Sequence, residues 1–183
     1  MDKKATVLLI IGTSLLQFIY ALTTPVINVY FFSRVSAEIL AVANLINIGM
    51  AAIVNASVSY DRLMDIYRKW FFAIVVVDVI CFCCISFLSP EHVIVRFIGF
   101  ALLNAVSTNL WCIVIRDCIN RHISGESLTK WNSKYEAFTL SASFAGGIFA
   151  IAFVNLDIEL CIAMQCFANI VMGCTDLSAY RRL

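Results

Sequence analysis

The chain has 183 residues, of which 62% are hydrophobic and 14% charged, and its mean hydropathy is +0.91. Soluble domains are nearer half apolar and a quarter charged, so the excess of apolar residues is typical of a chain embedded in lipid. The net charge of +1 provides no broad basic surface and argues against nucleic acid as a partner.

The first apolar segment follows Met-Asp-Lys-Lys and carries no charge over residues 5–33. A secretory signal peptide has a shorter apolar region and a small-residue cleavage site after it. Neither feature is present. We therefore expect a retained first transmembrane helix.

Further apolar segments follow along the chain. A helix needs about 20 mainly apolar residues to cross the hydrocarbon core. A polar turn over 120–127 separates the fourth segment from the fifth. The sequence predicts an all-α membrane protein with one domain over 1–183 and six transmembrane helices, approximately 5–32, 38–60, 70–88, 92–116, 132–155 and 158–176.

The distribution of Lys and Arg predicts the orientation of these helices. Cytoplasmic connections carry an excess of basic residues. With the N-terminus inside, 11 of the 13 Lys and Arg are cytoplasmic, whereas Arg34 lies on an outer connection and Arg96 at the start of the fourth helix. We expect a multi-pass protein of the cell (inner) membrane with both termini in the cytoplasm.

Five polar residues recur along the first helix. They are Thr13, Gln17, Tyr20, Thr24 and Asn28, at offsets of 4, 3, 4 and 4, which places them on one stripe. One interpretation is that they hydrogen-bond neighbouring helices. The other is a water-lined substrate path, which the number of residues in register favours.

Polar residues on two other helices extend this candidate path. The second helix contributes Asn47, and the fourth contributes Arg96, Asn104, Ser107 and Trp111. Arg96 lies about one turn into its helix. It either extends to the outer interface or faces the cavity and attracts an anionic group.

Asp78 interrupts the third apolar segment. It follows Trp70 by eight residues, about 12 Å at the helical rise. A carboxylate at that depth must be protonated, hydrogen-bonded or paired. The alternatives are a role in proton coupling and a structural hydrogen bond to a neighbouring helix.

The eight cysteines do not form a recognisable site. Cys81, Cys83 and Cys84 have no partner pair at zinc-ligand spacing, and neither His92 nor His122 is placed to help. Nucleophile elbows, phosphate loops and metal-binding helix motifs are lacking as well. The sequence predicts no enzyme activity, cofactor, metal site or disulfide framework.

Several short segments occur at regular places along the predicted topology: Thr24–Tyr30, Arg62–Lys69, Arg96–Phe100, Arg116–Arg121 with Gly125–Glu126, and Ser143–Gly147. They resemble motifs of the N-terminal six-helix half of the major facilitator superfamily. The Arg62–Lys69 segment is similar to the signature loop between helices two and three, with Asp61 where its first glycine belongs. The others resemble the end of helix one, the start and exit of helix four, and the small-residue region of helix five.

This resemblance implies a bundle like half of a major-facilitator transporter. It also implies a cytoplasmic gate in which Asp65 and Asp117 join Arg68 or Lys69. The alternative is that these charges are the ordinary cytoplasmic residues of the connections.

Transporters of this kind bind substrate between two six-helix halves near the membrane midplane. We therefore expect a half-size transporter that works as a parallel homodimer, with a path for an unidentified small molecule or peptide between protomers. The alternatives are half of a heterodimeric transporter, and a non-transport interaction or immunity subunit that covers another membrane protein.

Overall fold

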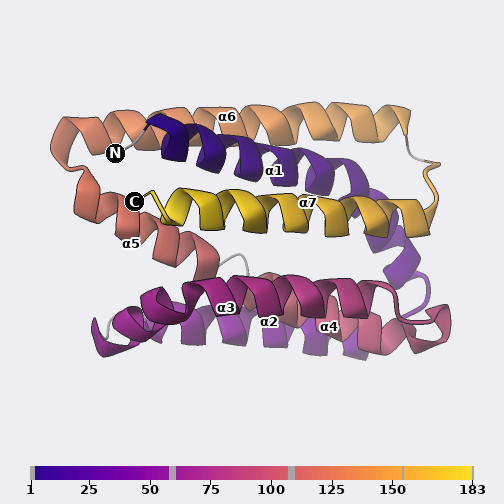
Figure 1. Cartoon of the computed structure of the whole chain (residues 1–183). Coiled ribbons are helices and arrows are strands. Elements are labelled where there is room, and N and C mark those ends of the chain that lie inside the picture. The colour runs from indigo at the N-terminus through magenta and orange to yellow at the C-terminus, as the bar shows by residue number, and fades with distance from the viewer. Residues whose placement is uncertain (1–2, 58–60, 107–109, 154, 183) are drawn as a thin grey trace. The chain divides into compact units, whose positions relative to one another are not determined.

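The computed structural model describes residues 3–57, 61–106, 110–153 and 155–182, and this part of the chain is helical (Figure 1). A 3₁₀ turn, Pro90–His92, precedes the fourth helix. The α-helices are α1 (Lys3–Phe32), α2 (Ala37–Ser57), α3 (Asp61–Ser86), α4 (Val93–Val106), α5 (Cys112–His122), α6 (Gly125–Ala152) and α7 (Ile158–Tyr180).

Five of the described helices, α1, α2, α3, α6 and α7, are long and apolar enough to cross a membrane. A shorter apolar helix covers Val93–Leu103 within α4. The expected all-α, multi-pass membrane architecture is confirmed at this level. A lipid bilayer is the environment that such helices require.

The chain divides into two compact units. Unit 1 comprises Met1–Val29 and Asp117–Leu183, and unit 2 comprises Tyr30–Arg116. Both α1 and α5 pass from one unit into the other along the chain. A single domain over 1–183 stays a prediction.

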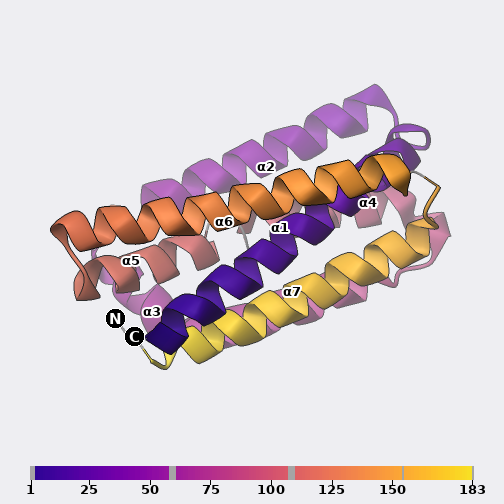
Figure 2. The ribbon, with the colours of Figure 1, turned by 90° about the horizontal axis from the view of Figure 1, so that it is seen from above.

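In unit 1, α1 lies beside α6 and α7 (Figures 1 and 2). The helices come close where residues are small. A Cβ atom on Gly146 of α6 would lie 2.3 Å from the backbone oxygen of Phe18, and one on Gly12 would lie 1.9 Å from the Thr175 hydroxyl. Small residues allow this approach between membrane helices.

In unit 2, α4 packs against both α2 and α3. An aromatic cluster fills the space between the elements. The Phe31 ring, at the end of α1, lies 5.1 Å from that of Phe97, and the Phe100 ring lies 5.2 Å from that of Phe82. Such aromatic pairs bury large areas in tilted or edge-to-face geometry.

Two helices begin earlier than the sequence predicted. The third starts at Asp61 rather than at residue 70, because 61–69 contains neither Gly nor Pro and nothing in it opposes helix formation. The segment that resembles the signature loop is therefore helical over Arg62–Lys69, not a loop. The fifth starts at Gly125 rather than at residue 132.

The helix predicted over 92–116 corresponds to two elements. Its first part is α4 and its last part belongs to α5, while residues 107–109 lie outside the described structure. The break between the fourth and fifth predicted helices is confirmed, and it is confined to residues 123–124 between α5 and α6.

Candidate functional site: the polar face of α1

The first three residues of the α1 stripe make hydrogen bonds to neighbouring helices of unit 1. The Tyr135 hydroxyl of α6 donates to Thr13 Oγ1 at 3.1 Å, and the Ser143 hydroxyl donates to Gln17 Oε1 at 3.2 Å. On α7, Asn169 Nδ2 donates to the Tyr20 hydroxyl at 3.0 Å. These contacts are the interhelical bonds that the sequence left as an alternative.

A further polar pair lies in the same unit and was missed by the sequence analysis. Thr23 is fully buried, and its Oγ1 accepts a hydrogen bond from Gln165 Nε2 of α7 at 3.0 Å. The Thr23 hydroxyl in turn donates to the Ile19 carbonyl at 2.7 Å. Gln165 and Asn169 are four residues apart on α7, so the same spacing argument could have found them.

The two carboxamide residues of the stripe are exposed. Gln17 and Asn28 are exposed and Thr24 is half-buried, although α1 is otherwise an apolar helix. Gln17 and Asn28 are separated by 11 residues, which is about three helical turns. They therefore present two carboxamides on one side of α1.

Arg96 of α4 is fully buried and does not extend to the surface. Its Nη2 atom donates a hydrogen bond of 2.9 Å to the backbone carbonyl of Ser86, the last residue of α3. The final carbonyls of a helix lack helical donors, and a cation near a helix C-terminus is stabilising. Arg96 therefore caps α3.

The remaining residues of the predicted path lie in different settings. Trp111 is almost fully buried and Asn47 is half-buried. The side chain of Asn104 and the whole of Ser107 fall outside the described structure. The structure thus gathers Thr13, Gln17 and Tyr20 with partners in unit 1, whereas Asn47 and Arg96 belong to unit 2.

Two carboxylates are buried within apolar helices. Asp78 of α3, the candidate for proton coupling, is 6% exposed. Asp176 of α7 is 2% exposed, and the sequence analysis did not single it out. Its position in the last turns of α7 gave no signal, because acidic residues near a helix end are usually solvated.

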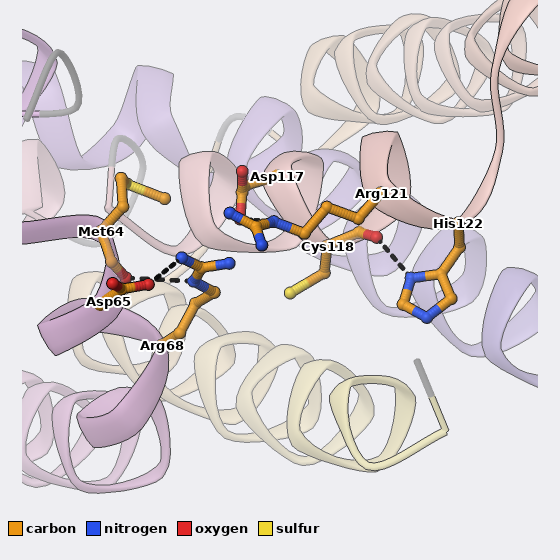
Figure 3. Close-up of polar contacts among 7 residues, drawn as sticks. All are labelled: Met64, Asp65, Arg68, Asp117, Cys118, Arg121 and His122. Atoms are coloured by element: carbon orange, nitrogen blue, oxygen red, sulfur yellow. Dashed lines mark hydrogen bonds and ion pairs between the residues drawn. The ribbon is translucent and has the colours of Figure 1, made fainter. Parts of the chain in front are cut away.

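The charges of the predicted gate form ion pairs within single helices (Figure 3). Arg68 pairs with Asp65 on α3, and its Nε atom also donates to the Met64 carbonyl at 3.3 Å. Arg121 pairs with Asp117 on α5 at 3.0 Å. Lys69 is exposed. Pairs three or four residues apart are an ordinary feature of helix surfaces, and a gate formed by them stays a prediction.

The thiols and histidines form no evident centre in the described residues. All eight cysteines are free, and no group of three or more His, Cys, Asp or Glu side chains gathers in the described ranges. His122 Nδ1 lies 2.7 Å from the Cys118 carbonyl on its own helix (Figure 3).

No known protein family, curated protein or solved structure matches this chain. The resemblance to the major facilitator superfamily therefore rests on its short motifs alone, and the polar face of α1 is the candidate site.

Proposed function

We propose that this protein is a half-size membrane transporter in which two parallel copies form a substrate path, as in a major-facilitator bundle. The observation that carries the proposal is the exposure of Asn28 on the same side of α1 as the rest of the polar stripe. A carboxamide in hydrocarbon without a partner costs about 1–3 kcal/mol. A second copy, or water in a path between copies, removes that cost.

The directions of the helices in unit 1 support six spans. Contacts from Thr13 to Tyr135 and from Phe18 to Phe149 make α1 and α6 parallel. Two parallel spans must be separated along the chain by an odd number of crossings. Since α2 and α3 supply two, the segment that contains α4 and α5 would supply the third.

The lengths of α4 and α5 agree with one shared crossing. With 14 and 11 residues, they extend about 21 Å and about 16 Å. Either is shorter than a hydrocarbon core of about 30 Å, and together they exceed it. With α7 antiparallel to α1, both ends of the chain would lie on one side, which the basic residues indicate is the cytoplasm.

Single-cysteine labelling tests this topology. In a variant without native cysteines, Ser36→Cys and Glu91→Cys should react with an impermeant external thiol reagent, and Ser124→Cys should react only after permeabilisation. External labelling of Ser124→Cys would contradict six spans.

Solute flux tests transport itself. Purified protein in liposomes is exposed in turn to radiolabelled amino acids, sugars and organic cations, and the label taken up is counted. We expect at least one class to produce flux above that of protein-free liposomes. Asn28→Leu should abolish that flux by closing the path, whereas Val29→Leu, at an exposed apolar neighbour, should leave it unchanged. The absence of flux in both the wild type and Val29→Leu would contradict the proposal. Equal flux in Asn28→Leu and Val29→Leu would contradict it as well.

A second candidate is an interaction subunit that covers another membrane protein. The bonds of Thr13, Gln17 and Tyr20 to α6 and α7 favour it, because a stripe satisfied inside one chain is less free to bind solute. In that case a different protein, not a second copy, would cover Asn28. Cross-linking at Asn28 distinguishes the candidates.

A further inference from the structure

A pocket of about 390 Å³ opens where the start of α1 meets the end of α7. Lys3, Lys4, Val7 and Leu8 of α1 line it together with Arg182, which follows α7. These ends lie side by side in unit 1 (Figures 1 and 2). The volume falls within the range of about 300–1,000 Å³ that is typical of small-molecule sites.

The chemistry of the lining suits a phosphate group attached to an apolar tail. The lining is mainly apolar surface from Val7, Leu8 and the aliphatic stems of the basic residues, and Lys3, Lys4 and Arg182 bring three cationic side chains to it. A guanidinium binds phosphate oxygens through its planar fork, and an ammonium binds them as a point charge. The stems of Lys3 and Lys4 can lie along apolar surface while their charges reach the headgroups.

The helix ends around the pocket act on an anion in opposite directions. The C-terminus of a helix carries partial negative charge on its last carbonyls. At the end of α7, the Leu177 and Ala179 carbonyls already accept the backbone N–H groups of Arg181 and Arg182, at 3.2 and 2.8 Å. The first N–H groups of α1, by contrast, have no acceptor within the helix.

We propose that this pocket binds the headgroup of an anionic diacyl phospholipid, with Lys3, Lys4 and Arg182 on the phosphate and Val7 and Leu8 against the first carbons of an acyl chain. The site lies at the ends of two candidate membrane spans, where headgroups are found, and basic pockets between helices at that depth bind anionic lipids. The site does not depend on transport.

The test measures lipid retention by the full chain. Protein in neutral detergent is titrated with phosphatidylglycerol or phosphatidylcholine, and bound lipid is counted by native mass spectrometry. We expect phosphatidylglycerol to be retained preferentially. Each cation removed should weaken binding about fivefold, so Lys3→Gln/Lys4→Gln/Arg182→Gln should lose about a hundredfold.

A matched control removes the same charges elsewhere. Arg121→Gln/Lys130→Gln/Lys134→Gln also lacks one Arg and two Lys, all exposed, and should bind as the wild type does. Equal losses of lipid binding in the two triple variants would contradict the proposed pocket, because general surface charge would then account for the binding. Equal retention of the two lipids by the wild type would overturn it as well.

Further measurements distinguish binding of a lipid from binding of a free anion, and loss of a contact from misfolding of the variant. Inorganic phosphate should not displace phosphatidylglycerol, and full displacement would assign the site to a soluble anion instead. Leu8→Ala should weaken lipid binding through the lost apolar contact. Lys3→Arg/Lys4→Arg keeps both charges and should retain the lipid; loss of binding in this variant would overturn the proposed role of charge.

Discussion

The two units hold their helices together by different chemistry. In unit 1, hydrogen bonds between helices lie in the middle of apolar segments, at Thr13, Tyr20 and Thr23. In unit 2, two bonds between helices lie at helix ends. Tyr67 donates to Ser57, the last residue of α2, and Arg96 donates to Ser86, the last residue of α3.

This difference indicates what fixes the position of each helix. Phenylalanine rings fill the interior of unit 2, and their contacts can tolerate small shifts in register. A hydrogen bond in the hydrocarbon region is satisfied in one register only, because lipid offers no alternative partner. Polar contacts thus fix helix positions in unit 1, which carries the candidate site.

The largest expected effect concerns the contact between α1 and α6. A side chain on Gly146 would collide with the backbone of Phe18, whereas a Cβ on Gly147 has nothing within 4 Å. We expect Gly146→Leu to lower the free energy of unfolding by about 3 kcal/mol or more. Unfolding in detergent, followed by circular dichroism, measures this. Gly147→Leu is the control, and an equal effect of both would contradict the close packing.

Arg96 tests the helix-end contacts of unit 2. Arg96→Met removes a charged donor from a buried carbonyl, so we expect a loss of about 1.5–3 kcal/mol of stability. Arg96→Lys keeps the charge but cannot reproduce the guanidinium geometry, and it should fall between Met and the wild type. Arg62→Gln, at an exposed arginine of the same unit, should change stability by no more than about 0.5 kcal/mol. If Arg96→Met behaves like Arg62→Gln, the proposed cap is wrong.

The smallest effect concerns the polar pair in unit 1. A double-mutant cycle of Thr23→Val and Gln165→Leu should give a coupling energy of about 0.6 kcal/mol, and no more than about 1.7 kcal/mol. A parallel cycle of Thr23→Val with Ser178→Ala, whose hydroxyl bonds the Cys174 carbonyl of its own helix, should give no coupling. Coupling in both cycles, or in neither, would remove the pair as a determinant of register.

The apolar segments were sufficient to predict the five long helices, but not the starts of α3 and α6 or the division of 92–116 into α4 and α5. The sequence could not predict the partners of the α1 stripe. Tyr135 and Ser143 are more than 120 residues away along the chain, and a single Tyr or Ser on an apolar helix is equally typical of lipid interfaces. The choice between a path and interhelical bonds depends on those distant partners.

Arg96 and the segment 61–69 show two other limits of the sequence. The position of Arg96 near a helix start left open whether it reaches the outer interface or faces a cavity. Its actual partner, the Ser86 carbonyl, is a backbone group that no residue pattern reveals. The segment 61–69 was left outside the third predicted helix because its charged residues precede the apolar stretch 70–88. Its lack of Gly and Pro was the better guide, since local propensity there agrees with the helix.

The central claim is that a second copy of the chain lies against the exposed side of α1. Asn28→Cys, in a variant without native cysteines, is expressed in its native membrane and treated with a short bifunctional thiol reagent. The proposal predicts a cross-linked homodimer for Asn28→Cys and much less for Val29→Cys, which points about 100° away around the helix. Monomer alone for Asn28→Cys, or equal cross-linking at both positions, would contradict it.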